Sequence, residues 1–178
     1  KLDIQDPNYS RHVSMGWNYR MPELCCAVAL AQLENIDKLI DVRIRAANFF
    51  NEVVGNFNWL KPQKVGSEYK NSYWTYVVKI DREDVSWHKF RDKFLELGGD
   101  GIYATWKINY LEPMFQNMSL LGREQFISEK NKKFYKKGLC PVAENLQPRL
   151  LQFKTNYWDK EKLIRQAEVL EKTIKFFD

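Results

Sequence analysis

A long run of apolar residues at three- and four-residue spacing, from residue 24 to residue 50, constrains the fold of this chain more than any other feature. Pro22 fits the first turn of a helix, where its missing N–H costs nothing, and Glu23 complements the helix dipole. With Gly55 as a natural end, the pattern predicts a long helix, or a bent pair, over residues 22–55, about 45 Å long at 1.5 Å per residue. We expect so long a segment to bridge two domains or two subunits. The apolar positions are Leu24, Ala27, Ala31, Leu33, Ile36, Leu39, Ile40, Ile44, Ala47 and Phe50.

After this segment the sequence predicts short strands that alternate with helices. Asp84 or Ser86 can cap the first of these helices, and Asp159 caps the last, which carries one apolar stripe from Leu163 to Phe177. The order β-α-β-α-β-α indicates a small sheet covered by helices. The predicted strands are 73–80, 102–106 and 150–154. The predicted helices run from Asp84 or Ser86 to Gly98, over 123–137, and from Asp159 onward. The predicted connectors are 56–71 and 139–147.

Composition favours one packed globular chain. Of 178 residues, 44% are apolar and 15% aromatic, which argues for a core rather than disorder. No run of eighteen apolar residues exists, so we expect no membrane span, and the N-terminus lacks the apolar stretch of a signal peptide. Cys25, Cys26 and Cys140 are an odd set. We interpret them as three buried thiols of a cytosolic protein rather than as metal ligands.

The net charge of +5 suits an anionic ligand without requiring nucleic acid. The densest basic run, Lys130–Lys137, falls on the predicted helix 123–137, where such runs are usually a solvated face. No compact RNA- or DNA-binding motif accompanies it, so we expect no nucleic-acid partner.

The polar loop at residues 16–21 contains the best candidate binding groups. Asn18 offers an amide donor and Arg20 a forked guanidinium, and both precede a rigid helix. Such a pair can hold a phosphate or a carboxylate. The alternative is that Asn18 caps the helix while Arg20 pairs with a surface acid.

The order Gly-x-Asn-x-Arg-Met, then Ala-x-Ala-Leu-Ala-Gln-Leu, closely resembles the DegT/DnrJ/EryC1/StrS sugar aminotransferases, which use pyridoxal phosphate. Residues 97–103, 111–115 and 140–144 resemble later segments of the same family, in the right order. The resemblance implies an α/β fold, the C-terminal part of a fold-type I aminotransferase with a small, mainly antiparallel sheet. It also implies an interface loop at 1–21, a bridging helix at 22–55 and a small domain at 56–178.

By this resemblance, Asn18 hydrogen-bonds the phosphate of the cofactor bound by the neighbouring subunit. Arg20 either lies near the substrate or orders the loop. Lys107 and Tyr110 are candidate substrate-loop residues, with ordinary loop exposure as the alternative, and Tyr110 stands where many members have a histidine. The Leu-Pro pair that many members carry before the last helix is also missing here. Only fifteen residues precede Gly16, whereas the family's catalytic lysine lies some tens of residues upstream. We therefore assign no catalytic residue and no metal ligand in this chain.

The implied reaction moves an amino group, usually from glutamate, to a keto sugar carried on a nucleotide, in a cytoplasmic homodimer. The chain alone is expected to be inactive. Two alternatives stay open: a non-catalytic dimerisation module of the same fold, and a basic nucleic-acid binder using Lys130–Lys137. A set of aromatic residues could stack on a nucleotide base, but we assign it to packing. These residues are Trp74, Tyr76, Trp87, Tyr103 and Trp106.

Overall fold

The computed structural model describes residues 3–13, 21–117 and 134–178. The chain divides into two compact units, each assembled from separate stretches of sequence. One unit comprises residues 1–22 and 104–148, and the other comprises residues 23–103 and 149–178. We call them the loop unit and the sheet unit.

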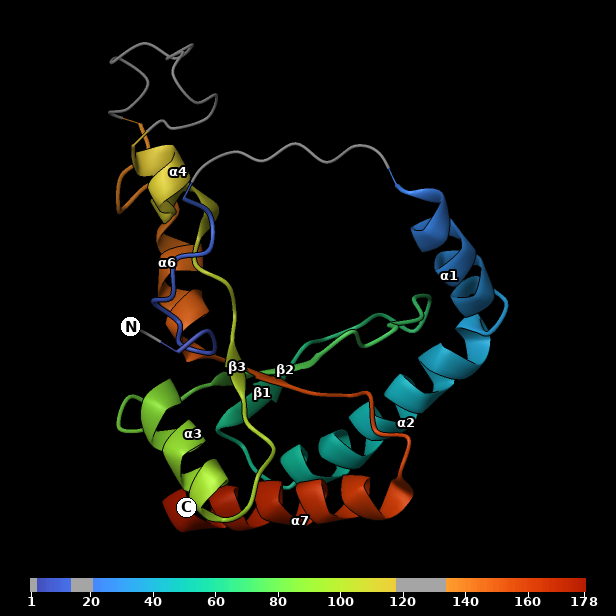
Figure 1. The fold of residues 1–178 in the computed structure, drawn as a ribbon. Helices are drawn as coiled ribbons and strands as arrows, with labels where there is room; N and C mark the ends of the chain where they lie inside the picture. Colours follow the sequence, from blue (N-terminus) through green and yellow to red (C-terminus); the bar gives the residue numbers. More distant parts are fainter. Residues whose placement is uncertain (1–2, 14–20, 118–133) are drawn as a thin grey trace. The chain divides into compact units, whose positions relative to one another are not determined.

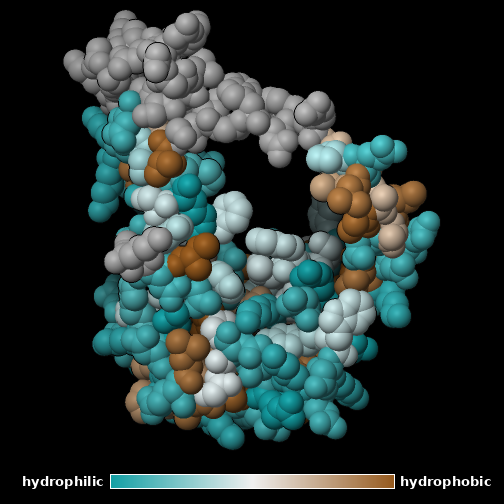
Figure 2. Space-filling model, in the orientation of Figure 1, coloured by the Kyte–Doolittle hydropathy of each residue, from teal (hydrophilic) through white to brown (hydrophobic). Residues whose placement is uncertain are grey.

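The sheet unit begins with two consecutive helices, α1 (Glu23–Leu33) and α2 (Ile36–Val54), which confirms the bent pair (Figure 1). The two helices differ in burial. Five side chains of α2 are buried along one face, whereas α1 has no buried residue. The apolar side chains of α1 therefore gather on an exposed surface, at the right of Figure 2. The exposed large apolar residues of α1 are Leu24, Val28, Leu30 and Leu33.

Four short strands form one sheet in the order β1-β2-β4-β3. They are β1 (Leu60–Pro62), β2 (Tyr76–Ile80), β3 (Tyr103–Ala104) and β4 (Leu150–Phe153). β2 pairs antiparallel with β1, with Leu60 opposite Ile80, and antiparallel with β4, with Val78 opposite Leu151. Buried and half-buried residues alternate along β2, so one face of the sheet meets the core.

Helices α2, α3 (Trp87–Glu96) and α7 (Lys160–Phe177) enclose this core, and α7 packs on both of the others. The centre is aromatic. The Phe50 ring lies 5.5 Å from Tyr76, 5.7 Å from Phe153 and 6.3 Å from Tyr157, centroid to centroid. The predicted α/β arrangement, a small and mainly antiparallel sheet covered by helices, is confirmed.

Within its described residues, the loop unit contains little regular structure. Its elements are the 3₁₀ turn η1 (Asn109–Leu111), the short helices α4 (Pro113–Gln116) and α6 (Pro141–Leu146), and most of the turn η2 (Gln147–Arg149). The connector predicted at 139–147 is therefore wrong, because Pro141 starts a helix there. The helix predicted over 123–137 is wrong for residues 134–137, which form turns, and residues 118–133 lie outside the described ranges.

Further corrections concern local elements. The connector predicted at 56–71 contains β1, and the strands predicted at 73–80 and 102–106 are shorter than expected. Ser86 caps α3 by accepting the Lys89 N–H, whereas Asp84 pairs with Arg82. Asp159 caps α7 as predicted, accepting the N–H groups of Glu161 and Lys162.

The interpretation of the cysteines as buried thiols is wrong, because Cys25, Cys26 and Cys140 are all exposed and unpaired with each other. The first two lie on α1, which buries nothing within the described residues. The described helices include none with the length and apolar character needed to cross a membrane.

Candidate functional site

Two of the four predicted site residues, Lys107 and Tyr110, lie in the described part of the loop unit. Both belong to the stretch that leads from β3 to α4. Asn18 and Arg20 lie in residues 14–20, outside the described ranges. Their predicted roles therefore stay predictions, and the site is built here from the residues around Lys107 and Tyr110.

The Lys107 ammonium is held by the N-terminal segment. Its Nζ donates to the Ser10 hydroxyl at 3.0 Å. Because a lysine ammonium has three donor hydrogens, this single bond fixes its position while it can still donate to an anion. Lys107 is thereby a fixed cation on the predicted substrate loop.

Tyr110 is tied to the segment that precedes and begins α6. Its hydroxyl donates to Glu144 Oε1 and accepts the Cys140 N–H at 3.1 Å. The same carboxylate accepts the Gly138 N–H at 2.7 Å. Burial and the bond to Glu144 raise the pKa of Tyr110 to about 12, while the hydrogen bond from Tyr110 lowers the pKa of Glu144. The Tyr110 hydroxyl thus donates its proton to a hydrogen bond with Glu144, and this bond holds the loop in place.

Among the described residues of the loop unit, Glu112 is the most buried charged group, with 1% of its side chain exposed. It follows η1 directly and precedes α4. Its Oε2 accepts the backbone N–H groups of Arg11 at 3.1 Å and His12 at 3.3 Å, and its Oε1 lies 3.4 Å from His12 Nδ1. A buried carboxylate needs such donors to offset its lost hydration.

His12 completes this arrangement with its half-exposed imidazole, whose Nδ1 faces Glu112. The imidazole ring lies 6.4 Å from the Trp106 ring, and the Arg11 guanidinium lies 5.2 Å from the Tyr9 ring. The carboxylate thereby orients the imidazole through its Nδ1 atom. Sequence reasoning missed this pair, since no local pattern joins residues a hundred positions apart.

Further bonds join residues 3–13 to the rest of the loop unit. The Met114 N–H donates to the His12 carbonyl at 2.9 Å, and the Ala104 N–H donates to the Gln5 carbonyl at 3.0 Å. The Gln147 amide donates to the Pro7 carbonyl at 3.1 Å. The segment that leads into the predicted phosphate-binding loop is therefore anchored along its length.

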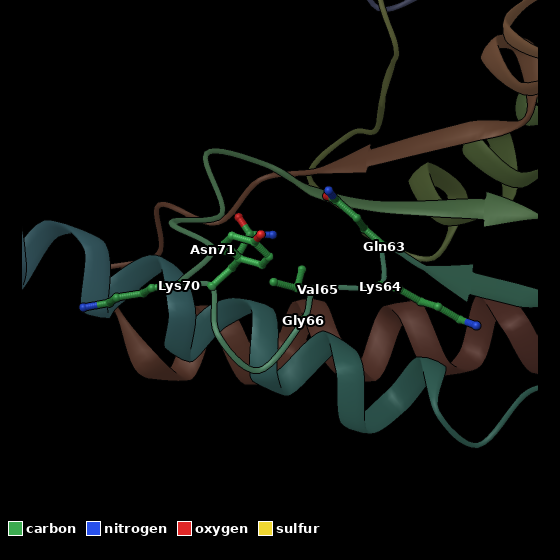
Figure 3. Close-up of a pocket in the computed structure, with 7 residues that line it drawn as sticks. Gln63, Lys64, Val65, Gly66, Lys70 and Asn71 are labelled. Carbon is green, nitrogen blue, oxygen red and sulfur yellow. The ribbon is translucent and has the colours of Figure 1, made fainter.

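The sheet unit contains a hollow of about 370 Å³ formed by the loop between β1 and β2. In Figure 3, Lys64 and Lys70 line this hollow but point away from it, in opposite directions. Lys70 instead lies 3.9 Å from Asp41 of α2. The hollow lies within the loop's own bend, and its two cations are not directed at a common ligand.

Residues 3–13, 21–117 and 134–178 contain no cluster of three or more His, Cys, Asp or Glu side chains that could bind a metal ion. What the loop unit does present is a fixed ammonium, a committed tyrosine and a buried carboxylate that orients an imidazole. Of these groups, the Lys107 ammonium can donate to a polar, anionic substrate.

Known proteins resemble this chain in fold and in sequence. An aminotransferase from Psychrobacter cryohalolentis superposes with a TM-score of 0.69 at 13% identity, over 93% of this chain and 42% of that one. A protein from Streptococcus pneumoniae, assigned as a sugar aminotransferase and solved in its pyridoxal-phosphate form, superposes with a TM-score of 0.64 at 13% identity, over 88% of this chain and 36% of that one. Both likenesses concern the fold.

In sequence, the GDP-perosamine synthase of Vibrio cholerae is 27% identical over 124 residues, which are 67% of this chain and 30% of that protein. The chain spans about a third or less of the length of the curated relatives it matches. The model of the DegT/DnrJ/EryC1/StrS aminotransferase family matches residues 3–155, and the chain belongs to that family.

Proposed function

We propose that this chain is the C-terminal portion of a pyridoxal-phosphate-dependent transaminase. The protein transfers an amino group, from glutamate, to a keto sugar nucleotide in amino-sugar biosynthesis. The observation that carries the proposal is the family match over residues 3–155, which spans both the predicted phosphate-binding loop and the substrate loop with Lys107 and Tyr110. The relative named GDP-perosamine synthase supports the substrate class.

The cofactor supplies an electron sink for the exchange of the amino group when it is bound. Asn18 holds the cofactor phosphate of the neighbouring subunit, and Arg20 binds the substrate. Lys107 places its ammonium against the substrate's phosphates, steadied by Ser10. Tyr110 shapes the substrate loop through its bond to Glu144. The Schiff-base lysine is expected outside this chain, which is then inactive alone.

A homodimer follows from the proposed role of Asn18, which serves the neighbouring subunit's cofactor. The surface of α1 supports it, since Leu24 alone is 78% exposed and the helix buries no residue. Contiguous apolar surface of this kind marks a contact with other protein. We also propose a cytoplasmic location. It is supported by the three cysteines, which form no disulfide with one another, because disulfides form in oxidising compartments.

The test uses the protein encoded by the complete reading frame. Asn18→Ala is expected to weaken pyridoxal-phosphate binding about tenfold, the cost of one charge-assisted hydrogen bond, measured by titration at the cofactor's own absorbance. Asn48→Ala, at an exposed position of α2, is the matched control. Conversion of a GDP-linked keto sugar with glutamate is then followed by mass spectrometry.

Failure separates the alternatives. Association into dimers with no affinity for pyridoxal phosphate, and no effect of Asn18→Ala, would favour the non-catalytic dimerisation module. Cofactor binding without transfer to any keto sugar nucleotide would keep the cofactor role and overturn the substrate class. Nucleic-acid binding that falls steeply with salt would favour the basic binder instead.

A further inference from the structure

The starting point is Arg43, a half-buried residue of α2 whose side chain is held from one end. Its Nη1 donates to the Trp74 carbonyl at 3.0 Å and to the Thr155 hydroxyl at 3.0 Å. Thr155 is fully buried, and its own hydroxyl donates to the Tyr73 carbonyl at 2.7 Å. The guanidinium is therefore fixed before any ligand arrives, which lowers the entropic cost of binding.

The charge of Arg43 is not neutralised in the described ranges. No Asp or Glu carboxylate there forms an ion pair with it, and both printed acceptors of its hydrogen bonds are neutral oxygens. The neighbouring Asp41 lies beside Lys70. An arginine has five donor hydrogens in a planar fork, so the Nε and Nη2 groups can still bind an oxyanion in two-point fashion.

Two hollows of the sheet unit meet at Arg43. One, of about 330 Å³, lies between α2 and the segment before β2, with Ser72 and Trp74 on its far side. The other, of about 220 Å³, is lined by Asn156 and Trp158, from the segment between β4 and α7. Gln32, Leu39 and Arg43 line both. In Figure 1 the segment between β4 and α7 passes α2 before α7 begins.

Each hollow carries one exposed tryptophan. Trp74 is 66% exposed and Trp158 is 60% exposed, although indole rings are mostly buried in packed cores. The packing that the sequence predicted for the aromatic set holds for Tyr76 and Trp87 but is wrong for Trp74 and for Trp106, which is 54% exposed. An exposed indole beside a fixed cation can stack on a flat ring.

We propose that the Arg43 groove is a binding site for an oxyanion carried on a ring, of the nucleoside phosphate class. The phosphate lies on the Arg43 guanidinium, the ring stacks on Trp158, and the amides of Gln32 and Asn156 bind polar edges. The site lies wholly in the sheet unit, whereas Lys107 and Tyr110 belong to the loop unit. It therefore goes beyond the proposed transaminase function and does not depend on it.

The experiment titrates the 178-residue chain by isothermal calorimetry with guanosine monophosphate, uridine monophosphate, uridine and inorganic phosphate. We expect both monophosphates to bind, and uridine and inorganic phosphate each to bind at least about tenfold more weakly, because each lacks one of the two recognised parts. Equal binding of inorganic phosphate and the monophosphates would show a simple anion site and overturn the role of the ring. Absence of any binding would overturn the whole proposal.

Variants locate the site. Arg43→Lys removes the fork and is expected to weaken binding of the monophosphates about tenfold, while Arg45→Lys, exposed on another face of α2, leaves it unchanged. Trp158→Leu is expected to weaken binding at least about fivefold. Its control is Phe176→Leu, which removes an equally exposed ring from the last turn of α7.

Because Arg43 also joins α2 to Trp74 and Thr155, its variant is checked by circular dichroism. If Arg43→Lys unfolds the chain, Trp158→Leu alone decides, since its side chain is exposed and its loss leaves the core intact. Unchanged affinity in folded Trp158→Leu and Arg43→Lys would place the nucleotide elsewhere and contradict the proposal.

Discussion

Different kinds of interaction stabilise the interior of each unit of this chain. The sheet unit has an apolar core in which Phe50, Tyr76 and Phe153 meet. The described residues of the loop unit include few buried side chains, and their segments are joined by polar groups that bond to backbone, chiefly Glu112, Glu144 and Gln147. Non-directional burial tolerates small shifts, whereas each hydrogen bond fixes a definite geometry. The predicted site lies in the unit held by directional bonds.

The largest test of this difference removes the centre of the apolar core. Phe50→Ala deletes a ring that is 1% exposed and contacts three other aromatic rings. We expect the free energy of unfolding to fall by about 3–5 kcal/mol, measured by urea denaturation. Phe176→Ala, at an exposed ring, is expected to change it little. A loss below that of the control would mean that the core is not organised around Phe50.

A smaller effect is expected in the loop unit. Glu112→Ala leaves the N–H groups of Arg11 and His12 without their acceptor, at a cost of about 1–3 kcal/mol. Hydrogen exchange should then accelerate in residues 3–13 and stay unchanged in α2 and α7. Glu83→Gln, at an exposed position, is the control. Acceleration spread evenly over both units would show that they do not respond separately.

A polar contact in the sheet unit sharpens the comparison. Asp159→Ala removes the cap of α7, whose apolar face is already held by Leu163, Leu170 and Ile174. We expect a loss of about 1 kcal/mol and no change in hydrogen exchange beyond the first turn. If the loss of this cap frayed the whole helix, packing would contribute less to the sheet unit than its burial implies.

The smallest effect concerns the titration of Tyr110. Its pKa lies near 12 instead of 10.0, first through burial and then through Glu144. A raised pKa in the folded state stabilises the fold below pH 10, and this contribution is lost as the pH rises through about 12. Glu144→Gln should lower the pKa of Tyr110 without returning it fully to 10.0, because the burial persists.

The tyrosinate absorbance measures that shift, and subtraction of the Tyr110→Phe titration isolates Tyr110 from the other tyrosines. Glu83→Gln serves again as the control. A pKa that stays near 12 in Glu144→Gln would assign the whole shift to burial and remove the argument that the carboxylate commits the Tyr110 proton.

The same contrast explains what the sequence could predict. Helical periodicity placed Ala47 and Phe50 on the buried face of α2, and Leu163 and Leu170 on that of α7, because apolar burial repeats at a regular spacing. Nothing periodic marks Glu112, which binds residues a hundred positions away. The short helix at Pro141 was missed for a related reason, since six residues are too few to show a repeat.

For the site, a local motif singled out Lys107 and Tyr110, but their partners Ser10 and Glu144 required the fold. The exposure of Cys25 and Cys26 was missed because their apolar surroundings on α1 normally indicate a core. A helix that is apolar on all sides and yet exposed cannot be distinguished by composition from one that is buried.

The division of the chain into interleaved units has a consequence for how the molecule can be dissected. The chain passes between the units after Pro22, after Tyr103 and after Pro148, so neither unit is one continuous stretch. A shortened chain beginning at Glu23 loses the contacts that residues 11 and 12 make with Glu112. Residues 104–148 alone lack Pro7 and Ser10, which bond to Gln147 and Lys107. A single protease cut between the units therefore releases neither of them intact, and a genetic exchange of either unit with a relative requires three junctions.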